Sequence, residues 1–159
     1  MSAEATGTIT ADGVRFERLY DATPDELWHA ITDPEQIKGW LAHTTRWTLS
    51  PGEDWGIRFE DGDAGGRVVS VDEGRVLELT WIEEERESLL RFEIVPREAG
   101  CLLVLNHTRL PAAKVPAYGA GWQVHLESLG VLLEGGTAFD WWERFNALRQ
   151  SYNELAAVR

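Results

Sequence analysis

His107 is the residue of this sequence that is best suited, by its type and its position, to acid–base chemistry or ligand binding. It lies near the end of the stretch CLLVLNHT, residues 101–108, where Leu103, Leu105 and His107 occupy alternate positions and share one face of a predicted strand. An imidazole on such a face can act as a general acid or base, or can donate a hydrogen bond to a ligand oxygen. The alternative is a buried histidine satisfied by its neighbours, so His107 is a weak catalytic candidate.

The other residues of reactive type lack the neighbours or the spacing that a catalytic or metal site needs. His125 flanks the seam of a predicted helix, and Cys101 begins a strand without a base nearby in the sequence. The run that starts at Asp61 has aspartates at positions one, three and twelve of a calcium loop, but Gly65 stands at the fifth position and strands flank the run. No HExxH, CxxC or Walker-type motif is present. We therefore expect no metal site and no cofactor.

The composition argues against several classes of partner. Of the 159 residues, 27 are Asp or Glu and 15 are Lys or Arg, which gives a formal net charge of −12. This charge repels nucleic-acid phosphates and anionic lipid headgroups, so we expect neither nucleic acid nor a membrane as a partner. One cysteine and a start without signal-peptide features favour a reducing cytoplasm. The length predicts one domain over residues 1–159.

Two short helices must follow a first strand, VRFERLY, over residues 14–20. Thr23 with Glu26 forms a predicted capping box, and Asp33 with Gln36 repeats the device. Each predicted helix has only about two turns, too few to persist in water, so each must dock on another element. Each ends near a tryptophan, and we expect both helices to close one end of the fold.

The remaining patterns are strand and then helix. Residues 44–109 alternate apolar and polar positions between regular turn signals, which predicts an antiparallel meander. Trp122, Leu126, Leu129 and Leu133 then mark one face of a long helix, ended by Gly135 or Gly136. A last helix is predicted over residues 137–158. Because the seam of the long helix needs cover, it should lie across the buried face of the sheet.

Four stretches in this order resemble the START-like, Bet v-type superfamily, in the branch of heat-shock-protein-90 ATPase activator homologues. They are DATPDELWHAITDPEQIKGW, GGRVVSVDEGRVLELTW, LLRFEIVPREAGCLLVLNHTRL and YGAGWQVHLESLGVLL. The resemblance covers residues 14–134 and implies an α+β helix-grip fold. In that fold a curved antiparallel sheet, here of about six or seven strands, wraps around a long helix. The terminal helix is an addition to the family pattern.

The resemblance also implies a hydrophobic small molecule held in a cavity between sheet and helix. Eight tryptophans in one short chain suit the walls of such a cavity. The alternative is that these large side chains fill the space and leave a dry core. The predicted lining residues are Phe16, Tyr20, Trp28, Trp40, Trp55, Ile57, Phe59, Leu79, Trp81, Leu90, Phe92, Leu105, His107, Trp122, Leu126 and Leu129.

Two other functions compete with ligand binding. One is a protein-interaction role like that of a co-chaperone or a stress-response module, and the other is a cyclase or hydrolase that uses His107. The terminal helix adds a further expectation. Its seam of Trp141, Phe145, Leu148, Tyr152 and Leu155 is more apolar surface than a monomer usually exposes, so we predict a homodimer through this helix.

Overall fold

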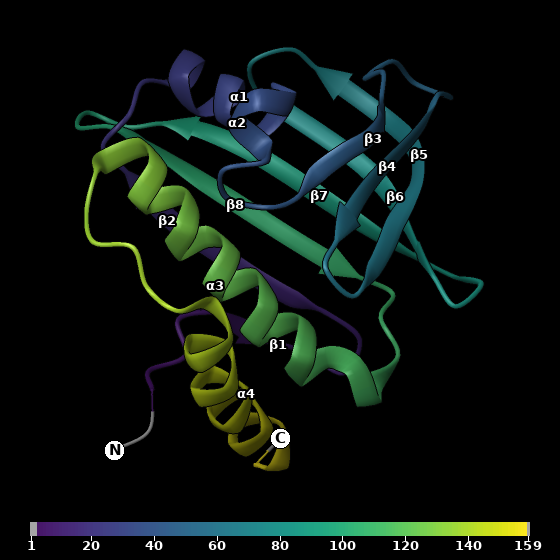
Figure 1. The fold of residues 1–159 in the computed structure, drawn as a ribbon, viewed down its shortest axis with the longest axis vertical. Helices are drawn as coiled ribbons and strands as arrows, with labels where there is room; N and C mark the ends of the chain where they lie inside the picture. Colours follow the sequence, from purple (N-terminus) through teal and green to yellow (C-terminus); the bar gives the residue numbers. More distant parts are fainter. Residues whose placement is uncertain (1–2, 159) are drawn as a thin grey trace.

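The computed structural model describes residues 3–158, and residues 1–2 and 159 of the predicted domain lie outside this range. Within it, a curved antiparallel sheet of eight strands wraps around one long helix (Figure 1). This confirms the predicted α+β helix-grip arrangement, including two short helices and an additional terminal helix. The strands are β1 (Thr8–Ile9), β2 (Val14–Tyr20), β3 (His43–Trp47), β4 (Asp54–Phe59), β5 (Gly62–Asp72), β6 (Val76–Glu83), β7 (Arg86–Pro96) and β8 (Cys101–Thr108). The helices are α1 (Pro24–Thr32), α2 (Pro34–Ile37), η1 (Ala112–Lys114), α3 (Val115–Glu134) and α4 (Trp141–Ala157).

The strand order is β1-β2-β8-β7-β6-β5-β4-β3, so the meander β3 to β8 ends beside the first long strand. Register places Val14 opposite His107, and His107 opposite Leu90 on the next strand. Leu90 in turn lies opposite Leu79. Because directly paired residues project from the same face of a sheet, these four side chains form one row across the concave side. The two-residue strand β1 was not predicted, since two residues carry no periodicity.

The two short helices form where their caps were predicted. Thr23 Oγ1 accepts from the Glu26 N–H at 3.1 Å and Glu26 Oε1 accepts from the Thr23 N–H at 2.8 Å, which completes the capping box of α1. The Asp33 side chain caps α2. α2 is shorter than the two turns expected, because the N–H groups of residues 40, 41 and 42 all converge on the Ile37 carbonyl and curl the chain into turns.

Helix α3 runs across the concave face of the sheet, and α4 packs along one flank of α3, near the β1–β2 edge of the sheet, where the Tyr152 ring lies 6.4 Å from the Phe16 ring (Figure 1). Gly135 ends α3 with φ of +76°, a conformation that glycine adopts without strain, as the sequence predicted. α4 starts at Trp141, later than the predicted residue 137, because the Asp140 side chain caps it by accepting from the Glu143 N–H at 3.0 Å. α1 contacts β7 and α3, and α2 contacts β3, so the two short helices cover one end of the sheet.

Candidate functional site

The side chain of His107 lies at the centre of a buried hydrogen-bonded chain. Its Nδ1 is 3.0 Å from Nε1 of Trp122 on α3, and its Nε2 is 2.7 Å from Oγ of Ser88 on β7. The Ser88 hydroxyl donates onward to the Trp81 carbonyl at 3.0 Å. His107 and Ser88 are both buried, and Trp122 is 3% exposed. Strands β7 and β8 and helix α3 are therefore joined by one chain of hydrogen bonds inside an apolar core.

The partners fix the protonation of the His107 ring. An indole N–H only donates, so Nδ1 must accept from Trp122 and carries no proton. A neutral imidazole then has its proton on Nε2, which donates to Ser88 Oγ. The Ser88 hydroxyl donates its proton to the Trp81 carbonyl and accepts a hydrogen bond from His107. In a nucleophile with its general base the bond runs the other way, from the hydroxyl to the imidazole, so this pair is not arranged for nucleophilic catalysis.

Burial holds His107 in this neutral form. Removal from water lowers the pKa of the imidazole from 6.5 to about 3, because an imidazolium here would lose hydration without gaining a carboxylate. Protonation at Nδ1 would also break the bond from Trp122. His107 is therefore a permanent hydrogen-bond donor to Ser88 at neutral pH.

Aromatic rings surround this polar chain. The Trp81 ring lies 5.4 Å from the His107 ring, 5.4 Å from Trp55 and 5.7 Å from Trp122, measured between centroids. Phe92 meets Trp122 edge-on at 6.0 Å, and Phe59 lies 6.5 Å from Trp81. Centroid separations of this size are those of aromatic rings in contact. The space between the sheet and this part of α3 is thus occupied by side chains packed on one another.

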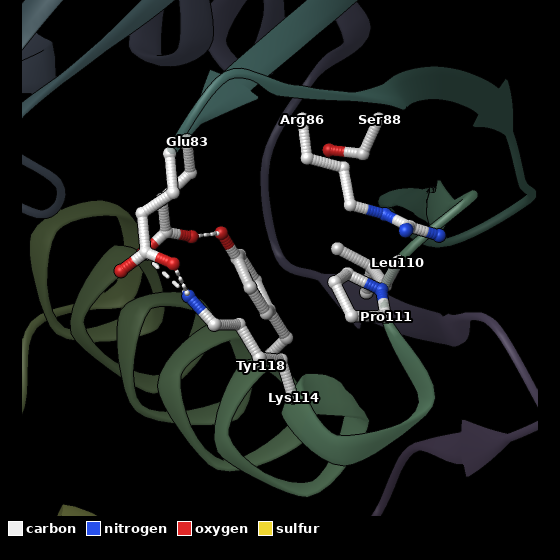
Figure 2. Close-up of a pocket in the computed structure, with 8 residues that line it drawn as sticks. Glu83, Arg86, Ser88, Leu110, Pro111, Lys114 and Tyr118 are labelled. Atoms are coloured by element: carbon white, nitrogen blue, oxygen red, sulfur yellow. Dashed lines mark hydrogen bonds and ion pairs between the residues drawn. The ribbon is translucent and has the colours of Figure 1, made fainter.

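A hollow of about 130 Å³ opens beside this cluster, and we call it the mouth hollow (Figure 2). It lies between the β6–β7 hairpin and the start of α3. Figure 2 shows Tyr118 and Lys114 of the helix region reaching toward the acidic end of the hairpin, with Arg86 and Ser88 on the other side of the opening. The lining residues are Glu83, Glu84, Arg86, Ser88, Leu110, Pro111, Lys114 and Tyr118.

Tyr118 forms one wall of the mouth hollow and is tied to the hairpin. Its hydroxyl donates to the Glu83 carboxylate, and Lys114 Nζ lies 3.5 Å from Glu83 and 3.3 Å from Glu84. Burial of the ring, with the Glu83 carboxylate adding to it, raises the pKa of Tyr118. The Tyr118 ring is also 4.9 Å from the His107 ring. One side chain therefore separates the solvent-facing opening from the buried chain at His107.

The predicted lining residues fall into separate groups. Those that pack with His107 in the aromatic cluster and the rows beside it are Trp55, Ile57, Phe59, Leu79, Trp81, Leu90, Phe92, Leu105 and Trp122. Trp28 and Trp40 lie at the end closed by α1 and α2, where Trp40 Nε1 donates to the Ala30 carbonyl at 2.8 Å. Tyr20 donates to the Leu126 carbonyl at 2.7 Å, and Leu129 is buried on α3.

Phe16 and Leu126 line a second hollow, of about 210 Å³, between β2 and α3. We call it the edge hollow. None of the sixteen predicted residues lines the mouth hollow. Ser88 and Tyr118, which do, were not among the sixteen. Extending the alternation Leu90–Phe92 back by two positions reaches Ser88, and stepping back four from Trp122 reaches Tyr118.

The other polar candidates have structural partners. His125 Nδ1 lies 3.1 Å from the Trp40 carbonyl, which ties α3 to the turn after α2, and burial lowers the pKa of His125 to about 4. The buried thiol of Cys101 donates to the Ala22 carbonyl at 3.3 Å. Among residues 3–158 no three His, Cys, Asp or Glu side chains are grouped to hold a metal ion. No helix within the same range has the length and apolar character needed to cross a bilayer.

Comparison with solved structures supports the fold. CalU16 from Micromonospora echinospora superposes with a TM-score of 0.78 at 23% identity, over 91% of this chain and 88% of its own. The protein encoded by gene BPP1335 from Bordetella parapertussis gives 0.77 at 24% identity, over 97% and 94%. DynU16, a protein in the dynemicin biosynthetic locus, gives 0.74 at 24% identity, over 80% of this chain and 49% of its own. At such identities the likeness concerns the fold.

The family follows from the sequence itself. No curated protein matches the chain. The model of one protein family does, over residues 21–134, a range that starts after β2 and ends with α3. This confirms the START-like superfamily predicted from the four sequence stretches. The chain belongs to the family described as activator of Hsp90 ATPase homolog 1-like protein.

Proposed function

We propose that this protein binds a small hydrophobic molecule between the sheet and α3, and that the molecule enters through the mouth hollow. The observation that carries the proposal is the position of Tyr118. Its ring lines the hollow on one side and lies 4.9 Å from His107 on the other. Pockets that combine apolar walls with a few convergent polar groups are typical ligand sites.

The size of the mouth hollow requires Tyr118 to move. A cavity of roughly 150 Å³ is what a single benzene occupies in a protein interior. The mouth hollow, at about 130 Å³, is smaller. Swinging the Tyr118 ring outward breaks its bond to Glu83, which lies at the surface where water replaces the lost partner. The ligand then takes the place of the ring against Trp81 and His107.

Ser88 supplies the polar contact for the ligand. Its hydroxyl oxygen accepts from His107 and its proton goes to the Trp81 carbonyl, which leaves one lone pair of the oxygen unused. Ser88 also lines the mouth hollow. The preferred ligand therefore has an apolar body and one hydroxyl or N–H donor.

The proposal is binding without turnover. A general base at His107 would need a free lone pair on the imidazole, and Nδ1 already accepts from Trp122. In the enzyme alternative His107→Ala abolishes turnover. In the binding function proposed here, the same variant weakens binding only modestly, because the ligand forms its hydrogen bond with Ser88 and meets the imidazole only through packing.

A thermal-shift panel of lipids, steroids and polyketide-like phenols tests the proposal, because a bound ligand raises the melting temperature by mass action. Within the panel, 2-methoxynaphthalene is 2-naphthol with a methyl group in place of the hydroxyl hydrogen, so it keeps the ring system and lacks the hydrogen-bond donor. We expect 2-naphthol to bind more tightly to the wild type, and Ser88→Ala to remove this preference. Ser128→Ala on α3 is the matched control, because that hydroxyl bonds only within its own helix at 3.0 Å.

Tyr118→Ala provides a second arm. Removing the ring opens the mouth hollow, so we expect tighter binding of 2-naphthol together with a lower melting temperature of the free protein. The proposal fails if no compound of the panel raises the melting temperature of either protein. It also fails if Tyr118→Ala leaves binding unchanged.

We also propose that the protein forms a homodimer through α4. Leu148 and Tyr152 of the predicted seam are covered by α3, so the support comes from the aromatic side chains that stay exposed near the helix start, Phe139 at 38% and Trp142 at 47%. Light scattering coupled to size exclusion measures the mass in solution. A monomeric mass at high concentration contradicts the dimer, and Trp142→Ser should convert a dimer into monomers.

We propose a cytoplasmic location because Cys101 is a free thiol. Its thiol is free and buried, and a lone unpaired cysteine suits a reducing compartment. Fractionation of cells that express the tagged protein tests the location.

A further inference from the structure

The edge hollow lies beside the free edge of the sheet. β1 pairs only with Val14 and Arg15 of β2, so the rest of β2 has no strand on that side among residues 3–158. The hollow extends from there to α3 and the N-terminal segment. It shares no residue with the mouth hollow. The residues that line it are Thr6, Phe16, Glu17, Arg18, Leu19, Gln123 and Leu126.

Arg18 is the one cation among these residues. Its guanidinium lies over the Tyr20 ring, with Cζ 5.5 Å from the centroid. No hydrogen bond or ion pair joins the guanidinium to another side chain or carbonyl in the described part of the chain. Every fully buried polar side-chain atom there has a partner, so the unpartnered nitrogens of the half-buried Arg18 are not fully shielded from solvent.

The carboxylates near Arg18 are bonded elsewhere. Glu17, which also lines the hollow, pairs with Arg15 at 3.5 Å. Glu127 on α3 accepts two bonds from Arg144, each 2.8 Å long. Glu134 accepts from the Asp21 N–H at 2.7 Å. Their charges reach Arg18 through space, but none of them occupies the donor positions of its guanidinium.

The walls opposite Arg18 are apolar. Phe16 and Leu126 are buried side chains that border the hollow, and Leu19 borders it at the surface. The volume, about 210 Å³, exceeds the roughly 150 Å³ that accommodate a benzene molecule. The Gln123 amide adds no free group, since both of its atoms have two partners each. The hollow thus has space for one ring, and the Arg18 guanidinium in its wall is a planar group that can donate two parallel hydrogen bonds.

We propose that the edge hollow binds a small organic monocarboxylate of about the size of benzoate, with its ring against Phe16 and Leu126 and its carboxylate on Arg18. A guanidinium matches a carboxylate with two parallel hydrogen bonds. Dicarboxylates and phosphate esters are disfavoured, because Glu17, Glu127 and Glu134 repel a second negative charge. This site is independent of the proposed function, which concerns the mouth hollow.

Titration with benzoate, followed by NMR into the millimolar range, tests the proposal, and neutral benzamide is the matched ligand. We expect benzoate to shift the side-chain signals of Arg18 and Gln123 and to bind at least tenfold more tightly than benzamide. Arg18→Gln should weaken benzoate binding tenfold or more and leave benzamide unaffected. Arg46→Gln, which makes the same charge change on exposed β3, should leave benzoate binding within about twofold.

A further variant tests the electrostatics. Glu17→Gln removes a negative charge from the wall of the hollow, so it should tighten benzoate binding several-fold and leave benzamide unaffected. If Arg18→Gln does not fold, Arg18→Lys keeps the charge and loses the bidentate geometry, and benzoate should still bind several-fold more weakly.

Three results overturn the proposal: no benzoate binding in the millimolar range, equal affinity for benzoate and benzamide, or equal affinity in the wild type and Arg18→Gln. Ser88→Ala and Tyr118→Ala distinguish the two sites. Both variants alter binding at the mouth hollow and should leave the benzoate affinity unchanged. Failure of one site therefore does not decide the other.

Discussion

Two consecutive residues of α3, Trp122 and Gln123, bond to different neighbours: Trp122 to the sheet, and Gln123 to α4 and the N-terminal segment. Trp122 donates its indole N–H to His107 on the sheet, inside a cluster of aromatic rings. Gln123 turns toward α4 and the N-terminal segment, where its carbonyl oxygen accepts from the Thr6 N–H at 2.9 Å and from the Tyr152 hydroxyl at 2.7 Å. Its amide nitrogen donates to the Glu4 carbonyl at 2.9 Å.

This difference separates two structural roles. Between sheet and α3, ring packing fills the interior and one hydrogen-bonded chain crosses it. Between α3 and α4, a polar network ties residues near both ends of the chain to the middle of the long helix. Changes on the sheet side should therefore lower the stability of the whole molecule. Changes on the α4 side should loosen the two ends of the chain first.

Trp122→Ala should have the largest effect. It removes a ring that contacts Trp81 and Phe92 and leaves His107 Nδ1 buried without a donor. Large-to-small changes of buried aromatic residues cost about 3–5 kcal/mol, and an unsatisfied buried acceptor adds to this, so we expect a loss of about 5 kcal/mol. Urea denaturation measures it. Val69→Ala, at an exposed residue of β5, should cost under about 1 kcal/mol.

Lowering the pH should have the next largest effect. The pKa values of His107 and His125 lie at about 3 and about 4 in the folded protein, both below the usual 6.5 of the unfolded chain. The unfolded state therefore takes up protons first as the pH falls below about 6.5. The free energy of unfolding should fall by about 1.4 kcal/mol per pH unit for each of the two histidines, down to their folded-state pKa values.

Urea denaturation between pH 7 and pH 4.5 measures this slope. His107→Asn should remove the share of the slope that comes from His107, and His29→Gln, at an exposed histidine of α1, should retain it. An unchanged slope in His107→Asn would contradict the assignment of a buried neutral imidazole.

The sequence was sufficient for the fold because the deciding signals are local. The capping box at Thr23 and Glu26 needs four residues, and the alternation that places Leu103, Leu105 and His107 on one face needs five. β1 was not predicted, because its two residues are fixed by pairing with β2 rather than by their own pattern. The late start of α4 depends on which of two polar residues, Thr137 or Asp140, caps it.

The site was less predictable because it is built from three elements far apart in sequence. Alternation predicted that His107 shares a face with Leu105. It did not predict that Ser88 and Trp122 take both ring nitrogens, since that depends on register and on side-chain rotamers. The acceptor role of Nδ1 follows only once the indole N–H is seen to point at it.

Tyr152→Phe tests the side of α3 that faces α4. The phenol accepts from the Gly7 N–H at 2.9 Å and donates to Gln123 Oε1, so its loss leaves the Gly7 N–H without a partner and leaves Gln123 Oε1 with the Thr6 N–H alone. We expect a cost of about 2 kcal/mol. Hydrogen exchange should also show faster exchange at Thr6 and Gly7 than in the sheet. Tyr118→Phe is the control. Its partner Glu83 is exposed, so this variant should cost under about 1 kcal/mol.

If Thr6 and Gly7 of Tyr152→Phe are protected from hydrogen exchange as strongly as the sheet, the two sides of α3 are not separate in stability. In that case the N-terminal segment opens only with global unfolding, and its polar bonds belong to the same cooperative unit as the aromatic cluster.

Gly119 and Gly121 of α3 give the smallest and sharpest comparison. A Cβ at Gly119 would lie 2.6 Å from Cδ1 of the Tyr152 ring, whereas a Cβ at Gly121 would be 3.9 Å from the Phe145 ring. Alanine gains about 1 kcal/mol over glycine inside a helix. Gly121→Ala should therefore stabilise the protein by up to about 1 kcal/mol. Gly119→Ala should destabilise it by about 1 kcal/mol, because overpacking of α4 outweighs the same gain. If both variants are stabilising in urea denaturation, α4 shifts without cost, and the polar network rather than close packing holds it against α3.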